Sequence, residues 1–166
     1  TGLTANIVNV VELSPTFSTD STLFAGTTGN GLFKSTDGGE TWRKVRDAGL
    51  TSEFVWSLAI SPGFANDQTI FAGTVADGVF RSTDEGETWE HASPTVRVIP
   101  AAIGRANQTA LMMISPNFVE DGIIFAGTTQ DGVIRSTDSG DTWIQKIKGL
   151  AVPVVLAMAI SPNFAQ

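Results

Sequence analysis

The chain lacks several residue types on which particular functions depend. Its 166 residues include no cysteine, so neither a disulfide framework nor a thiolate metal site can form. No tyrosine occurs, which removes the phenolic nucleophile that some hydrolases use. Basic residues number 10 against 17 acidic ones, and the net charge of −7 argues against a nucleic acid partner. No apolar run approaches the roughly 20 residues that span a bilayer, so membrane insertion is not expected.

The remaining composition is that of an ordinary soluble globular protein. Hydrophobic residues make up 42% of the chain and charged residues 16%. This length is sufficient to bury a substantial core. The chain begins at Thr1 without an initiator methionine or a signal-peptide pattern, which indicates a mature or excised segment.

Internal repetition is the main positive signal. Three longer segments align without a gap and end in nearly the same eight residues, here called the octapeptide: TLFAGTTGNGLFKSTDGGETW (22–42), TIFAGTVADGVFRSTDEGETW (69–89) and IIFAGTTQDGVIRSTDSGDTW (123–143). A second shared sequence precedes each segment and occurs a fourth time: ELSPTF (12–17), AISPGF (59–64), MISPNF (113–118) and AISPNF (159–164). Repetition at this period is typical of solenoids, propellers and arrays.

The repeat spacing locates one insertion. Trp42 and Trp89 are separated by 47 residues, whereas Trp89 and Trp143 are separated by 54. The seven additional residues fall between Trp89 and Ser115, so the connection in this part of the chain is longer than its counterpart.

Each repeat predicts four short strands. In the first repeat they are VNVVELS (8–14), TLFAG (22–26), GLFKST (31–36) and TWRKV (41–45). The segments are rich in β-branched and aromatic residues or alternate in polarity, and glycine turns separate them. No stretch shows helical periodicity with caps.

Four strands per unit of 40 to 50 residues predict an all-β chain of β-propeller blades, each a four-stranded antiparallel sheet. We expect three complete blades and the inner strand of a fourth. Their expected bounds are about 3–50, 51–108 and 109–150, followed by 151–166.

The octapeptide is predicted to form the hairpin between the third and fourth strands. Asp37 is expected to accept hydrogen bonds from backbone N–H groups two or three residues further on. Gly39 permits a positive φ. Thr41 favours an extended backbone, and the Trp42 ring can pack on the preceding strand or on a neighbouring blade. The interpretation is a structural joint repeated three times.

The pattern S-x-D-x-G-x-T-W resembles the Asp-box, or bacterial neuraminidase repeat. Sialidases, xyloglucan-active glycosidases, sortilin-type receptors and photosystem II assembly propellers contain it. The resemblance implies a propeller fold, a structural role away from the active face, and an extracellular or periplasmic location in a bacterium. The structural Asp-box residues it implies are Ser35, Asp37, Gly39, Thr41, Trp42, Ser82, Asp84, Gly86, Thr88, Trp89, Ser136, Asp138, Gly140, Thr142 and Trp143.

Catalytic and metal-binding residues are not expected. Sialidases use a tyrosine nucleophile, an arginine cluster and an Arg-Ile-Pro motif, whereas RVIP (97–100) places its arginine one residue too far from the proline. Asp77 and Asp131 precede glycines and are interpreted as turn residues. The single histidine, His91, is interpreted as a surface or packing residue. The octapeptide offers too few oxygen donors for calcium, so no metal or cofactor is expected.

The insertion EHASPTVRVIPAAIGRANQ (90–108) is the candidate recognition loop, with Arg97, Ile99 and Arg105 as its residues. One interpretation is a loop that folds over its own blade. The alternative is a binding loop carried by a rigid scaffold. A protein or a carbohydrate is the ligand class considered.

Three blades are fewer than the roughly four to eight of a closed propeller. An arc of three leaves two apolar faces uncovered, so further blades of the same chain or copies of the chain are expected to cover them. Three functions stay open. The first is a non-catalytic binding or scaffolding propeller. The second is a segment of a glycoside hydrolase with its acids on other blades. The third is a self-assembling repeat array.

Overall fold

A computed structural model describes most of the chain. The described residues are 2–5, 7–45, 48–75, 77–92, 109–129, 131–146, 148–151 and 154–164.

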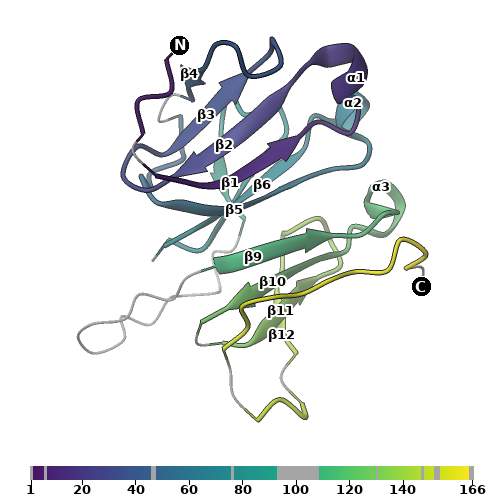
Figure 1. The fold of residues 1–166 in the computed structure, drawn as a ribbon. Helices are drawn as coiled ribbons and strands as arrows, with labels where there is room; N and C mark the ends of the chain where they lie inside the picture. The colour runs from purple at the N-terminus through teal and green to yellow at the C-terminus, as the bar shows by residue number, and fades with distance from the viewer. Residues whose placement is uncertain are drawn as a thin grey trace.

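Each repeat forms one four-stranded antiparallel sheet, in which every strand pairs with the next along the chain (Figure 1). The first sheet contains β1 (Val8–Leu13), β2 (Leu23–Thr27), β3 (Leu32–Ser35) and β4 (Arg43–Lys44). The second contains β5 (Val55–Ile60), β6 (Ile70–Thr74), β7 (Val79–Ser82) and β8 (Glu90–His91). The third contains β9 (Thr109–Ile114), β10 (Ile124–Thr128), β11 (Val133–Ser136) and β12 (Ile144–Gln145). The predicted all-β fold of four-stranded units is confirmed, and the sheets are called the first, second and third blade below.

Two features differ from the sequence prediction. The fourth strand of the first blade covers two residues, Arg43–Lys44, instead of 41–45. Thr41 and Trp42 precede it because their N–H and hydroxyl groups bond within the hairpin instead of in the ladder. The second difference is a short helical turn after β1. It was not predicted, because the sequence shows no helical periodicity there.

This helical turn occurs once in each blade, as α1 (Phe17–Asp20), α2 (Phe64–Asp67) and α3 (Phe118–Asp121). A serine hydroxyl at the start of each S-P-x-F sequence donates to the aspartate six residues later. The Oγ to Oδ2 distance is 2.5 Å for Ser14 and Asp20, 2.5 Å for Ser61 and Asp67, and 2.6 Å for Ser115 and Asp121. Four residues are too few to show a periodic pattern, so the Ser-to-Asp spacing is the only sequence signal for this turn.

The blades stack through their faces. The inner strands β1, β5 and β9 lie side by side in this order, with β5 between the other two (Figure 1). The face that a blade turns toward the next blade is called its trailing face, and the face toward the preceding blade its leading face.

Apolar side chains fill both junctions. Between the first and second blades lie Phe24, Leu32, Val45, Leu50, Val55, Leu58, Ile60, Phe64, Ile70, Ala72, Phe80 and Trp89. Between the second and third lie Ala59, Phe71, Val79, Ala92, Met112, Phe118, Ile124, Ala126, Ile134 and Trp143. Burial of one such large side chain contributes about 1.5–3 kcal/mol. The hydrophobic core of the chain therefore lies between blades.

One aromatic contact repeats at every junction. A phenylalanine of the second strand meets, edge to face, the phenylalanine of the next S-P-x-F sequence. The ring centroids are 6.1 Å apart for Phe24 and Phe64, and 5.7 Å apart for Phe71 and Phe118. Such pairs contribute about 0.5–1.5 kcal/mol beyond the area they bury.

Residues 154–164 make the same contact with the third blade. Phe164 meets Phe125 edge to face at 6.0 Å, and the Val155 N–H donates to the Thr128 carbonyl at 2.9 Å. This segment, yellow in Figure 1, runs beside the third blade without a strand ladder of its own. It occupies the place that β5 and β9 occupy at the other two junctions.

The glycine of the octapeptide is required by packing as well as by backbone geometry. A Cβ on Gly86 would lie 3.3 Å from Cε1 of Phe24, and a Cβ on Gly140 would lie 2.8 Å from Cε1 of Phe71. Both glycines also have positive φ, at 85° and 94°. The ring of one blade therefore rests directly on the hairpin backbone of the next.

We predict that Gly140→Ala destabilises the protein by about 2–4 kcal/mol, because a left-handed backbone and a clash with Phe71 act together. Gly38→Ala is the matched control, since Gly38 has a positive φ of 73° and open space around its hypothetical Cβ. Its counterparts Glu85 and Ser139 already adopt positive φ, so the control should lose about 1 kcal/mol. Urea denaturation measures both. Equal losses would contradict the packing role.

Candidate functional site

The three octapeptide hairpins share one hydrogen-bond network centred on the aspartate. Asp37 Oδ1 accepts the Ser35 hydroxyl at 2.7 Å and the Thr41 N–H at 2.9 Å, and Oδ2 accepts the Thr41 hydroxyl at 2.5 Å. Equivalent bonds join Ser82, Asp84 and Thr88, and join Ser136, Asp138 and Thr142.

A backbone N–H three residues after the aspartate, that of Glu40, hydrogen-bonds to the Asp37 carboxylate, within the expected range. The Thr41 N–H, four residues after the aspartate, is an additional donor that was not expected. Gly38, Gly39 and Glu40 separate Asp37 from Thr41, and the two glycines have positive φ. The chain turns through both before the Thr41 N–H faces the carboxylate.

Serine and tryptophan complete each hairpin. Ser35 Oγ accepts the Gly39 N–H at 2.9 Å, and the Trp42 indole N–H donates to the Gly39 carbonyl at 3.0 Å. In the third blade the Trp143 indole also donates to the Ala92 carbonyl of the second blade at 3.0 Å. The tryptophan thus joins neighbouring blades, one of the two roles that the sequence suggests.

The hairpin carboxyls have lowered pKa values. The Thr41 hydroxyl, followed by the Thr41 N–H and Ser35, lowers the pKa of Asp37 from 3.8 to about 2. The Thr142 hydroxyl is the main cause of the lowered pKa of Asp138. Burial raises the pKa of Asp84, but the hydrogen bonds from Thr88 and Ser82 outweigh it, so the net change is downward. These carboxylates are ionised acceptors at neutral pH and are poor proton donors.

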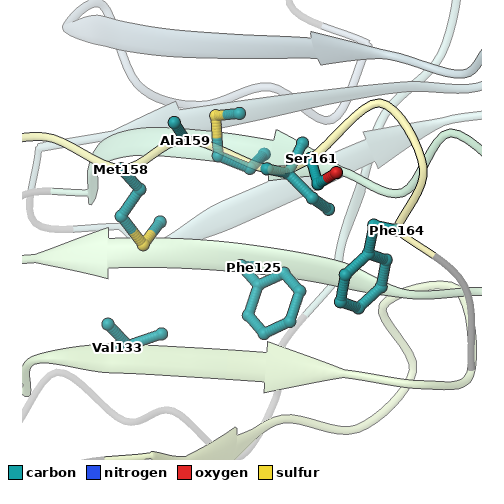
Figure 2. A pocket seen from close by; sticks show the side chains of 8 residues that line it. Phe125, Val133, Met158, Ala159, Ser161 and Phe164 are labelled. Atoms are coloured by element: carbon teal, nitrogen blue, oxygen red, sulfur yellow. The ribbon is translucent and has the colours of Figure 1, made fainter.

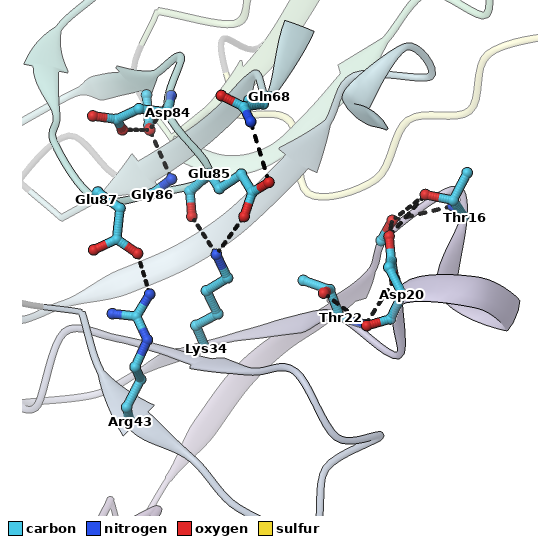
Figure 3. A network of polar contacts seen from close by, with 12 residues as sticks. Thr16, Asp20, Thr22, Lys34, Arg43, Gln68, Asp84, Glu85, Gly86 and Glu87 are labelled. Atoms are coloured by element: carbon cyan, nitrogen blue, oxygen red, sulfur yellow. Dashed lines mark hydrogen bonds and ion pairs between the residues drawn. The ribbon is translucent and has the colours of Figure 1, made fainter. Parts of the chain in front are cut away.

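The hairpins of the second and third blades also accept hydrogen bonds from a cation of the preceding blade, as Figure 3 shows for the second. Lys34 Nζ, on a side chain only 4% exposed, donates to the Glu85 carbonyl at 3.1 Å and to Glu85 Oε2 at 3.0 Å. Arg81 Nη1 donates to the Ser139 carbonyl at 2.7 Å and pairs with Asp141 Oδ1 at 2.7 Å. The accepting carbonyl is the one immediately before the hairpin glycine in both cases.

Sequence reasoning missed these cations. Their signal is a basic residue at one position of the third strand in every repeat, Lys34, Arg81 and Arg135. A second ion pair across the first junction joins Arg43 to Glu87 of the next hairpin (Figure 3).

The remaining candidates for chemistry hold turns in place. The carbonyl of Asp77 lies 2.5 Å from His91 Nε2, and the His91 ring packs on Phe80 at 5.0 Å. In the third blade Gln145 takes the histidine's place and donates to the Asp131 carbonyl at 2.9 Å. These contacts match the interpretation of the two aspartates as turn residues and of His91 as a packing residue.

The candidate recognition loop, 90–108, begins with the two residues of β8, Glu90 and His91. Arg97, Ile99 and Arg105 lie outside the described residues. Their role in binding stays a prediction.

A cavity of about 210 Å³ lies among the inner strands β1, β5 and β9. Its lining includes Glu12, Pro15, Leu58 and Met112, and Glu12 is the one ionisable residue among the described residues around it. Burial raises the pKa of Glu12.

A second cavity, of about 350 Å³, separates the third blade from residues 154–164 (Figure 2). Phe125 and Val133 form one wall, and Met158, Ser161 and Phe164 form the other. The lining is apolar apart from Ser161, so this hollow favours a hydrophobic occupant.

Two features are absent from the described part of the chain. No group of three or more histidine, aspartate or glutamate side chains there could hold a metal ion. Within the same ranges, no helix has the length and apolar character needed to cross a membrane.

Comparison with solved structures identifies the fold. The GH74 enzyme of Niastella koreensis matches with a TM-score of 0.63 and 24% identity, over 83% of this chain and 22% of that one. The extracellular domain of the one component system BT4673 of B. thetaiotaomicron matches with a TM-score of 0.62 and 14% identity, over 93% and 19%. YCF48 bound to D1 peptide matches with a TM-score of 0.59 and 15% identity, over 88% and 42%.

These neighbours are β-propeller proteins, and the described sheets are propeller blades. The chain spans about a fifth of the first two neighbours and less than half of the third. The sequence matches no protein-family model and no curated protein.

We predict that Asp84→Ala lowers the free energy of unfolding by about 1–3 kcal/mol, because the Thr88 N–H and hydroxyl lose their acceptor. Asp77→Ala is the control, since alanine retains the carbonyl through which Asp77 contacts His91. The control should change stability by less than about 0.5 kcal/mol. Chemical denaturation gives both values, and an unchanged Asp84→Ala protein would refute the structural role.

The lowered carboxyl pKa values predict acid-induced loss of stability. Asp37 has a pKa near 2 when folded and near 3.8 when unfolded, so its contribution is present above about pH 4 and is lost as the pH falls toward 2. The melting temperature should fall steeply within this interval. Asp84→Asn, which removes one of the three carboxylates, should fall less steeply. A wild-type profile that stays flat to about pH 2 would contradict the prediction.

Proposed function

We propose that this chain is part of a non-catalytic β-propeller that binds or scaffolds another molecule, and that its three octapeptides are Asp-boxes with a structural role. The observation that carries the proposal is that hydrogen bonds within each hairpin occupy its aspartate carboxylate. Asp37, Asp84 and Asp138 each accept hydrogen bonds from a serine and a threonine of their own hairpin.

Other acids near the hairpins serve inter-blade contacts. Glu85 pairs with Lys34, Glu87 with Arg43, and Asp141 with Arg81. Glycoside hydrolysis requires two carboxyl groups about 5–9.5 Å apart across a substrate. Among the described residues that line the inner-strand cavity, only Glu12 carries a carboxyl group.

A binding role suits a rigid stack of blades whose connections differ in length. The turns of Asp77 and Asp131 are held by His91 and Gln145, and the insertion makes the connection from β8 to β9 the longest between repeats. We propose that Arg97, Ile99 and Arg105 belong to the recognition surface. YCF48 bound to D1 peptide supports a peptide or protein ligand, and the GH74 neighbour supports a carbohydrate.

An extracellular or periplasmic location is part of the same proposal. It is supported by the extracellular domain of BT4673 among the neighbours.

A glycoside hydrolase segment is the second candidate. Two observations favour it, namely the likeness to a GH74 enzyme and the raised pKa of Glu12 in the inner-strand cavity. A carboxyl that stays protonated at higher pH is suited to act as a general acid. The partner carboxylate would then come from a blade outside the three described.

We predict that the purified chain does not turn over sialosides or β-glucan oligosaccharides. A product assay at high protein concentration measures this, with Glu12→Gln, Asp77→Asn and Asp131→Asn as matched variants. Turnover that disappears in any of these three variants would refute the non-catalytic function and identify the acid responsible.

A further inference from the structure

The inner-strand cavity contains one residue that differs in kind from its counterparts. Glu12 occupies the position of Ala59 and Met113, two residues before the serine of each S-P-x-F sequence. In the ladder Glu12 lies opposite Phe24, as Ala59 lies opposite Phe71. Residues opposite each other in an antiparallel pair share one face of the sheet. The Glu12 carboxyl therefore belongs to the trailing face of the first blade, on which Phe24 is fully buried.

The Glu12 carboxyl is half-buried without a counter-charge. Within the described ranges it makes neither an ion pair nor a hydrogen bond. The residues of β5 and β9 that line the cavity with it carry no ionisable group. Burial raises the pKa of Glu12, because the ionised form loses hydration. A carboxyl at this position costs free energy that the alanine of the second blade does not, and an opposite charge would offset the cost.

The remainder of the cavity wall is apolar. Leu58 and Ile60 of β5 and Met112 and Ile114 of β9 line it, and the methionine side chain adapts to the shape of an occupant. β5 lies between β1 and β9, so three consecutive blades form this wall (Figure 1). The volume of about 210 Å³ is below the roughly 300–1,000 Å³ of pockets for drug-sized ligands, so a short unbranched chain fits it best.

We propose that this cavity binds an alkylammonium group, with Glu12 as its counter-ion and the alkyl chain on the apolar wall. The side chain of a lysine or a free alkyl amine presents this chemistry, since both join an apolar stem to a compact charged head. The net charge of −7 attracts cations to the protein. The inference names a ligand class for the binding function proposed above and rests on that function.

Other ligand classes fit the cavity less well. Glu12 would repel an anion, and a neutral apolar molecule would leave the carboxylate without a counter-charge. A divalent metal ion requires several oxygen ligands, whereas the described lining offers one carboxyl group. An alkylammonium group matches both the single charge and the apolar wall.

Binding is linked to the protonation of Glu12. The ammonium group pairs with the ionised carboxylate, so affinity is full above the raised pKa of Glu12 and falls as the pH drops through it. Between pH 7 and pH 4, which is below the ordinary value of 4.5, affinity should fall at least about threefold. Asp37, with a pKa of about 2, stays ionised at pH 4, so its hairpin network is retained there.

An NMR titration of the methionine methyl groups tests the proposal. The chain has three methionines: Met112 lines only this cavity, Met158 lines only the cavity beside residues 154–164, and Met113 lines both. n-Butylamine should shift the Met112 signal and leave that of Met158 unchanged. n-Butanol, which has the same chain without the charge, should bind at least about tenfold more weakly. A blocked peptide with one lysine tests the side chain as the source, and its norleucine analogue is the neutral control.

Variants identify the counter-ion. Glu12→Gln should weaken n-butylamine binding at least about tenfold and abolish its pH dependence. Glu53→Gln removes an equal charge from an exposed residue and should change neither. Glu12→Met introduces the residue of the third blade and should also lose binding. It should melt at a higher temperature than wild type, because the unpaired carboxyl is gone, and it replaces Glu12→Gln if the latter unfolds.

Three results would each overturn the proposal: equal n-butylamine affinities of Glu12→Gln and Glu53→Gln, a Met112 signal that the amine does not shift, or a wild-type affinity that is the same at pH 7 and pH 4. Binding of n-butylamine without the peptide would identify a free amine as the ligand. Binding of both would identify a lysine side chain. None of these measurements involves hydrolysis, so the non-catalytic function is judged separately by the product assay.

Discussion

A phenylalanine ring resting on a hairpin glycine is the contact on which the rest of this structure depends. Phe24 on Gly86 and Phe71 on Gly140 bring neighbouring blades within van der Waals distance of each other's backbone. A side chain at the glycine position would clash with the ring, and the hairpin backbone must lie at a fixed distance from that ring. The aspartate network fixes that distance, because Asp84 and Asp138 each accept hydrogen bonds from a threonine N–H and hydroxyl. The hydrogen bonds within a blade therefore determine how well the hydrophobic contact between blades can form.

The inter-blade cation depends on the same geometry. Lys34 and Arg81 reach a carbonyl that points out of the hairpin only because the residue holding it has a left-handed backbone. Glu85 and Ser139 adopt this conformation without being glycine. The strain at these residues is offset by a hydrogen bond from a largely buried cation, which is stronger than one between neutral groups. Apolar packing and charge thus act at the same point of each junction.

The sequence predicted the strands and the hairpins, since repetition defines them without knowledge of packing. The S-P-x-F sequence was recognised as a repeat, but its helical turn was not, because a Ser14 to Asp20 bond leaves no periodic pattern. The partner of Lys34 could not be predicted either, since Glu85 lies 51 residues away and only the stacking of blades brings the two together. The hairpin position of Asp37 and a bond from the backbone three residues on were predicted, but the further bond from the Thr41 N–H depends on two φ angles that residue types alone do not fix.

The short outer strands affect whether other chains can add strands to the edges of the sheets. β4, β8 and β12 each contain only two residues, and two of these strands carry charged side chains such as Arg43 and Glu90. A long, flat edge strand is a template on which strands from other chains can pair. Short or charged edge strands suppress this route to amyloid-like aggregation. Addition of further strands is therefore disfavoured along the outer edges of these sheets.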